Sequence, residues 1–124
     1  MQDLSIRISL VKIPVTDFAA ATAFYREVLG FEEEFAVEAY GWAQYRVGEL
    51  PLCLYQTGMG GGSGEPGGDT GIHLEVSDAK AAFKFLGDQG AEFACDLTTS
   101  DDGGSFFEVK DPDGNTLKIC QAAG

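Results

Sequence analysis

Three side chains in this sequence could carry acid–base chemistry. The chain holds a single histidine, His73, and imidazole is the side chain whose unperturbed pKa lies closest to neutral pH. Glu108 is a second possible base, and the ammonium group of Lys118 could stabilise an anion that develops nearby. These residues are the catalytic candidates. For His73 the alternative is a packing or hydrogen-bonding role, and for Glu108 and Lys118 it is a mutual charge pair or direct contact with a ligand.

Nucleophilic chemistry has weaker support. The three cysteines, Cys53, Cys95 and Cys120, form neither an even disulfide set nor a CxxC pair, which favours reduced thiols in a cytoplasm. Cys53 lies in an apolar LCL stretch, and a buried thiol is usually inert. No Ser-His-Asp or Cys-His order is evident.

Composition limits the classes of partner. A chain of 124 residues with 44% hydrophobic content can build one well-buried core, so residues 1–124 are expected to form a single domain. Its net charge of -12 would repel nucleic acid and anionic membranes, and it favours either solubility alone or a cationic ligand. No signal-peptide pattern or apolar stretch of membrane-spanning length is present, so a cytoplasmic location is expected.

The elements that must position these residues occur twice. Val15-Thr16-Asp17 aligns with Val76-Ser77-Asp78, and Phe24 then aligns with Phe85. In each copy a strand leads to an aspartate that can cap a helix, and a glycine (Gly30 or Gly90) follows near the helix end. The pattern predicts two strand-to-helix units of one design.

Three strands are predicted after each helix. They span 35–39, 42–47 and 52–56 in the first copy, and 93–97, 105–110 and 116–120 in the second. The N-terminal stretch MQDLSIRISLVKIPV is also strand-like. Module one is therefore expected over about 5–57, a flexible Gly-rich linker outside the core over 58–70, and module two over about 71–121.

Alternation of apolar residues separates the two faces of the predicted sheets. Ile13, Tyr45, Leu74 and Leu117 belong to the apolar rows that helices should cover. The opposite rows mix aromatic with polar side chains, which is the composition of a ligand pocket. The predicted ligand-binding residues are Lys12, Trp42, Gln44, Cys53, Tyr55, His73, Glu75, Phe106, Glu108 and Lys118.

Three segments carry a family resemblance: VKIPVTDFAAATAFYREVLGF, GIHLEVSDAKAAF and VKDPDGNTLKI. With them the chain resembles the vicinal oxygen chelate superfamily, which includes glyoxalase I, bleomycin-resistance proteins and extradiol dioxygenases. The resemblance implies an α+β fold in which two βαβββ modules form a cup-shaped, curved mixed sheet around a central site. Many such proteins build the cup as a homodimer, so a homodimer is expected.

The resemblance also shows where metal ligands would lie. The four corresponding places hold Leu10, Cys53, Gly71 and Lys118. Leucine and glycine side chains offer no donor atom, and an ammonium group repels a cation, so only Cys53 could ligate. No metal and no other cofactor is therefore expected. A displaced site built from Cys53, His73 and Glu108 is the alternative.

The function expected from these observations is metal-free binding of a small molecule, with an aromatic or cationic ligand sequestered in the cup, as in bleomycin-resistance proteins. The first alternative is a metal-dependent lyase, dioxygenase or thiol transferase of glyoxalase type. The second is a metal-free enzyme with His73 or Glu108 as base and Lys118 as anion stabiliser.

Overall fold

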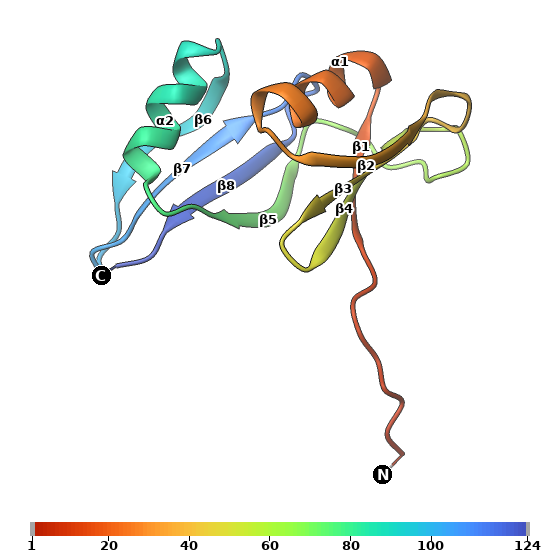
Figure 1. Cartoon of the computed structure of the whole chain (residues 1–124), viewed down its shortest axis with the longest axis horizontal. Helices are drawn as coiled ribbons and strands as arrows, with labels where there is room; N and C mark the ends of the chain where they lie inside the picture. Colours follow the sequence, from red (N-terminus) through yellow and green to blue (C-terminus); the bar gives the residue numbers. More distant parts are fainter. Residues whose placement is uncertain (1, 124) are drawn as a thin grey trace.

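Two four-stranded mixed sheets, each covered on one face by helix, make up the computed structural model, which describes residues 2–123 (Figure 1). The first module consists of β1 (Val11–Val15), α1 (Phe18–Ala23), a π-helical turn η1 (Phe24–Val28), β2 (Glu32–Val37), a 3₁₀ turn η2 (Glu38–Tyr40), β3 (Trp42–Val47) and β4 (Leu50–Gln56). The second consists of β5 (Asp69–Glu75), α2 (Ala79–Asp88), β6 (Glu92–Thr99), β7 (Ser105–Lys110) and β8 (Thr116–Gln121). This order confirms the predicted α+β fold of two βαβββ modules.

Both helices begin at the predicted aspartates. Asp17 accepts a hydrogen bond of 3.1 Å from the Ala20 amide, and Asp78 accepts one of 3.0 Å from the Ala81 amide. Each carboxylate thereby satisfies a backbone donor that has no partner within its helix. The repeated strand-aspartate-helix pattern thus has one structural cause in both modules.

The sheets share one topology. Their strand orders are β1-β4-β3-β2 and β5-β8-β7-β6, so β1 and β5 each lie at a sheet edge. In each sheet the first and last strands of the module run parallel, and the other pairs are antiparallel. The helix after β1 or β5 provides part of the long crossover that a parallel pair requires.

Two predicted strands, 42–47 and 105–110, are confirmed to the residue. The strand predicted over 35–39 instead covers Glu32–Val37, because the chain turns at Glu38–Tyr40. The strand-like N-terminus is also wrong for most of its length, since β1 begins only at Val11. Val11 pairs with Leu52, and β4 reaches only two residues beyond that position, so most of residues 2–10 have no part of β4 to pair with.

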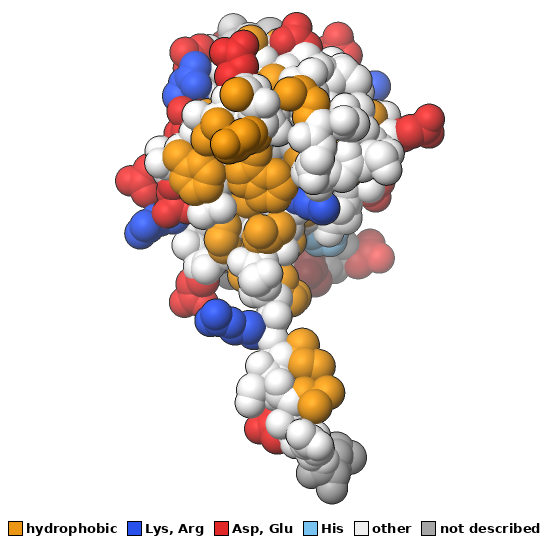
Figure 2. All heavy atoms as spheres, turned by 90° about the vertical axis from the view of Figure 1, so that its right-hand side faces the viewer, with side chains coloured by type: hydrophobic (Ala, Val, Ile, Leu, Met, Phe, Trp, Pro, Cys, Tyr) orange, Lys and Arg blue, Asp and Glu red, His pale blue; other side chains and the backbone are white. Residues whose placement is uncertain are grey.

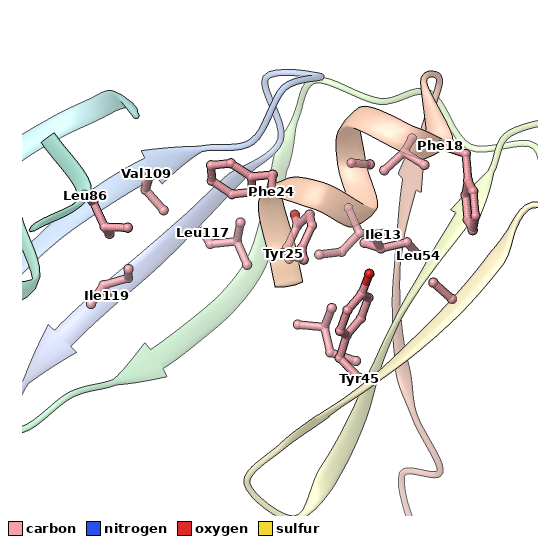
Figure 3. Packing of buried hydrophobic residues seen from close by; sticks show 14 of the residues in the cluster. Ile13, Phe18, Phe24, Tyr25, Tyr45, Leu54, Leu86, Val109, Leu117 and Ile119 are labelled. Atoms are coloured by element: carbon pink, nitrogen blue, oxygen red, sulfur yellow. The ribbon is translucent and has the colours of Figure 1, made fainter. Parts of the chain in front are cut away.

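The core lies between the helices and the covered faces of the sheets (Figure 3). Ile13, Tyr25 and Tyr45 are fully buried in the first module, and Phe107 and Leu117 in the second. Phe24 of η1 lies close to Leu117 of β8 in Figure 3, so the first helical segment also reaches the second sheet. One apolar cluster therefore spans both modules. No described helix is long and apolar enough to cross a membrane.

A buried polar network also joins the modules. Asp111, in the turn between β7 and β8, accepts hydrogen bonds of 2.8 Å from the Tyr25 hydroxyl and 2.9 Å from the Asn115 amide group. Asn115 also donates to the Pro14 carbonyl at 2.8 Å and accepts from the Gly67 amide at 2.7 Å. The predicted tight turn at 111–115 is thus also the polar joint between the two modules.

Candidate functional site

The open face of each sheet, opposite the helices, carries the residues that alternation assigned to it. Ile13 and Tyr45, from the predicted covered rows, are fully buried. Their neighbours Lys12 and Gln44 lie on the opposite face and are exposed or half-buried. Strand parity therefore placed these side chains correctly.

The aromatic part of the first sheet surrounds Lys12. Its ammonium nitrogen lies 4.9 Å from the centroid of the Tyr55 ring, a cation–π geometry, and donates a hydrogen bond of 2.8 Å to the Gly61 carbonyl. Trp42 is the cross-strand partner of Tyr55. A hollow of about 570 Å³ opens at this point, lined by Lys12, Tyr40, Trp42, Met59, Gly60 and Gly61. We call it the aromatic hollow.

Two residues of the aromatic hollow were missed by sequence reasoning. Tyr40 is 70% exposed and Met59 is 42% exposed, and neither belongs to a strand whose parity could assign it to a face. Figure 2, turned toward the right-hand side of Figure 1, shows hydrophobic side chains gathered over the body of the molecule. Exposed aromatic and sulfur-bearing side chains can contact a ligand without rearrangement of the core.

The Gly-rich run was expected to be a flexible linker outside the core. In the structure, part of it packs over Tyr55. A Cβ at Gly61 would lie 2.8 Å from the Tyr55 Cβ, and one at Gly62 would lie 2.7 Å from the Tyr55 ring. Thr57 also donates a hydrogen bond of 2.7 Å to the Gly64 carbonyl, which closes the loop. Glycine is needed here for close approach, and the loop leaves Tyr55 only 6% exposed.

Cys53 lies deeper in the same face. Its thiol donates to Oε1 of Gln44 at 3.6 Å, and Gln44 in turn donates to Glu34 at 3.1 Å. Burial, aided by the negative charge of Glu34, raises the pKa of the Cys53 thiol. The shift disfavours the thiolate, which is the form of cysteine that acts as a nucleophile.

The second sheet carries a separate polar set. Lys118 of β8 lies between its register partners His73 of β5 and Glu108 of β7, which confirms the predicted proximity of Glu108 and Lys118. Their charge pair does not form among the described residues. The Lys118 ammonium instead lies 4.3 Å from the centroid of the Phe106 ring. Lys118 is thus stabilised by an aromatic face.

His73 and Glu75 are exposed on the edge strand β5. Both line a groove of about 430 Å³ whose other walls are apolar side chains of both modules. That groove is distinct in its lining from the aromatic hollow, which includes no residue of the second sheet. Within one chain the two predicted sets therefore share no pocket, and among residues 2–123 no hydrogen bond or ion pair connects them. We call these sets the two half-sites: Lys12, Trp42, Gln44, Cys53 and Tyr55 on the first sheet, and His73, Glu75, Phe106, Glu108 and Lys118 on the second.

The places of a metal site do not fit a metal. Leu10 and Gly71 have no donor atom and Lys118 is cationic, so Cys53 is the one residue of the four whose side chain could ligate. Within residues 2–123, no three His, Cys, Asp or Glu side chains lie close enough to share an ion. The alternative metal site of Cys53, His73 and Glu108 does not form within one chain. Cys53 lies in the first sheet, whereas His73 and Glu108 lie in the second.

Comparison with known proteins gives a consistent result. A family model described as Glyoxalase/Bleomycin resistance protein/Dioxygenase superfamily matches residues 7–119. A solved member of that superfamily from Sphaerobacter thermophilus DSM 20745 is 27% identical, with a TM-score of 0.82 over 95% of this chain and 99% of that one. None of the curated proteins matches this sequence.

Two further structures share the fold at lower identity. The lactoylglutathione lyase of Agrobacterium tumefaciens is 16% identical, with a TM-score of 0.78 over 93% of this chain and 92% of that one. TioX from Micromonospora sp. ML1 is 20% identical, with a TM-score of 0.77 over 93% of this chain and 98% of that one. At these identities the likeness concerns the fold.

Proposed function

Because the chain belongs to the glyoxalase/bleomycin resistance protein/dioxygenase superfamily, we propose that it binds an aromatic small molecule without a metal ion, on the open face of its first sheet. The observation that carries the proposal is the aromatic hollow, in which Trp42 and Tyr40 border the Lys12 ammonium. A planar ligand can stack there and direct an acceptor group at Lys12.

The residues at the metal places support binding over metal-assisted catalysis. A metal in this fold would act as a Lewis acid on a substrate oxygen, and that requires several donor side chains around the ion. Leu10, Gly71 and Lys118 supply none. The chain keeps the open face of the fold but not the chemistry that a bound ion would provide.

Ligand charge follows from the two lysines. The net charge of -12 favours cations over the protein as a whole. At the half-sites, however, Lys12 and Lys118 place ammonium groups on both open faces. A neutral or anionic aromatic compound is therefore favoured over a cationic one at the hollow.

The test uses Trp42, the one tryptophan of the chain, as a fluorescent reporter. The protein is titrated with an aromatic sulfonate such as anilinonaphthalene sulfonate and, separately, with an aromatic cation such as ethidium. Saturable quenching of Trp42 by the sulfonate, together with a rise in melting temperature, is expected because a ligand of the folded state raises apparent stability. If the sulfonate produced neither response, or if ethidium bound more tightly than the sulfonate, the result would contradict the proposal.

Variants then locate the site. Tyr40→Ala removes an exposed wall of the aromatic hollow and should weaken binding about tenfold, which is the scale of one stacking contact. Leu50→Ala is the matched control, since Leu50 is 38% exposed but outside the hollow. Equal losses in both variants would place the ligand elsewhere.

The enzymatic alternatives have separate tests. Addition of Zn²⁺ or Ni²⁺ to the purified chain should produce no stoichiometric calorimetric binding, because the donor set is too poor. Tight binding of one ion per chain would favour a metal-dependent enzyme. An acid–base enzyme would lose turnover on Lys118→Met or His73→Gln with ligand affinity retained, whereas a pure binder has no turnover to lose.

A further inference from the structure

Met59 places a thioether sulfur in the wall of the aromatic hollow. The residue is 42% exposed and lines the hollow together with Tyr40 and Trp42. It belongs to the loop that follows β4, where its amide donates a hydrogen bond of 3.2 Å to the Gln56 carbonyl. The backbone of Met59 is therefore held in position, and a small molecule in solvent can reach the side chain without unfolding of the loop.

The sulfur lies beside Gly41, the residue that separates Tyr40 from Trp42 in the sequence. A Cβ built at Gly41 would be 3.1 Å from the Met59 Sδ atom, which is closer than ordinary van der Waals contact. Gly41 also has a φ of +60°, in the left-handed region that favours glycine. The missing side chain at residue 41 thus lets the sulfur approach the backbone that joins the two aromatic residues. Little room is left on that side, so an oxygen atom added to the sulfur is directed toward the hollow.

A thioether reacts with hydroperoxides, which are the class of oxidant that this reaction needs. A lone pair of the sulfur attacks one oxygen of hydrogen peroxide, and the S–O bond forms as the O–O bond breaks. The departing hydroxide takes up the proton of the attacked oxygen and leaves as water. The sulfur is oxidised by two electrons, and the peroxide is reduced by the same two. A methionine sulfoxide reductase reverses the step, with a dithiol that becomes a disulfide while the oxygen leaves as water.

Oxidation of Met59 alters the hollow directly. Met59 is the one methionine among residues 2–123, and Cys53, Cys95 and Cys120 lie on strands outside the lining of the hollow. Oxidation of a thiol therefore leaves the lining residues unchanged. The sulfoxide instead replaces a flexible apolar surface with a strongly polar group.

We propose that Met59 is a site of reversible oxidation, and that its sulfoxide lowers the affinity of the aromatic hollow for a planar ligand. The sulfoxide oxygen has to lose its water when an aromatic ring covers it, which costs free energy. It is also a hydrogen-bond acceptor in the same hollow as Lys12, so it competes with the acceptor group of the ligand for the ammonium. This regulation rests on the proposed function, because it requires a ligand in the hollow.

The experiment measures the Kd for anilinonaphthalene sulfonate, by quenching of Trp42, before and after treatment of the full chain with hydrogen peroxide. Dithiothreitol then reduces disulfides and sulfenic acids, and peptide mass spectrometry quantifies the Met59 sulfoxide. We expect the Kd to rise about tenfold on oxidation, which is the scale of one lost stacking contact. Methionine sulfoxide reductase should return the Kd to its initial value.

Three variants assign the effect to this sulfur. Met59→Leu has no thioether at the hollow, so peroxide should leave its Kd at the value measured for that variant before treatment. Met59→Leu combined with Leu50→Met moves the thioether to a position that is 38% exposed and outside the hollow, where oxidation should also leave the Kd unchanged. Met59→Gln carries a permanent oxygen at the hollow and should bind as weakly as the oxidised chain without any peroxide.

The outcomes separate this inference from the proposed function. Absence of sulfonate binding by the untreated chain would overturn both. Equal affinity of the reduced and the fully oxidised chain, an equal effect of peroxide on Met59→Leu, or no recovery with the reductase would overturn the inference alone. So would oxidation of Met59 that is far slower in the folded chain than in the urea-unfolded chain, a measurement that involves no ligand.

Discussion

The Tyr25 hydroxyl donates a hydrogen bond of 2.8 Å to Oδ2 of Asp111, 86 residues away in the sequence. Tyr25 is fully buried, and Asp111 is only 5% exposed. The contact connects η1 of the first module to the β7–β8 turn of the second. A helix and a turn that were predicted as local features are therefore held together by one buried hydrogen bond.

Tyr25→Phe should lower the free energy of unfolding by about 1–3 kcal/mol, because a buried carboxylate oxygen loses a donor while the ring packing is kept. Urea denaturation followed by far-UV circular dichroism measures the change. Tyr40→Phe, at a residue 70% exposed, is the control and should change stability by less than about 0.5 kcal/mol. Equal stability of Tyr25→Phe and wild type would mean that the hydrogen bond contributes nothing to the joint.

Asn115→Asp should be more damaging. The substitution replaces the Nδ2 donor, 2.9 Å from Asp111 and 2.8 Å from the Pro14 carbonyl, with a negatively charged oxygen. We expect a loss of roughly 3–5 kcal/mol at neutral pH, the cost of an uncompensated buried charge.

The loss in Asn115→Asp should shrink as the pH falls, because its carboxyl group, with a folded-state pKa above the unfolded value, is stabilised by protonation. Thermal melts between neutral and acidic pH check the trend. Asp113→Asn in the same turn keeps an oxygen acceptor for Thr16 and serves as the control. A loss that is independent of pH would point to packing and not to charge.

Gly61→Ala should lower stability by about 1–3 kcal/mol, since its new Cβ would lie 2.8 Å from the Tyr55 Cβ and 3.1 Å from the Trp42 ring. Gly68→Ala is a matched control in the same run, because a Cβ there meets nothing within 4 Å. Chemical denaturation compares the two. If both variants were equally stable, the glycine run would not be packed on Tyr55 in solution.

Cys53 should be the slowest of the three thiols to react with iodoacetamide. Burial and Glu34 raise the pKa of its thiol, so a smaller fraction is thiolate at any given pH and a more alkaline solution is needed to reach a given rate. Cys95 and Cys120 are only partly buried and should be labelled first. Peptide mass spectrometry after timed labelling gives the order, with the unfolded chain as reference. Labelling of Cys53 at the rate of Cys95 would contradict the prediction.

Local patterns in the sequence predicted much of the fold. The bounds of β3 and β7, the caps at Asp17 and Asp78 and the covered position of Ile13 all follow from alternation and from capping chemistry. These features depend on neighbours within a few residues, which is why one sequence suffices to find them.

Features that depend on distant contacts were missed. The strand-like N-terminus is unpaired for most of its length because β4 ends two residues beyond the partner of Val11, a fact that no property of the N-terminal residues themselves reveals. Glycine at 61 was interpreted as flexibility, although the same absence of a Cβ permits close packing on Tyr55. The division of the candidate site into two half-sites likewise depends on how two sheets are oriented, which strand parity does not contain.

The loop that covers Tyr55 also has a kinetic consequence. A compound that stacks on that ring has to wait until the glycine run lifts and the contact between the Lys12 ammonium and the Gly61 carbonyl breaks. In rapid mixing experiments the observed association rate should then level off at high ligand concentration, at the rate of loop opening, whereas a compound confined to Tyr40 and Met59 should show a rate that keeps increasing linearly.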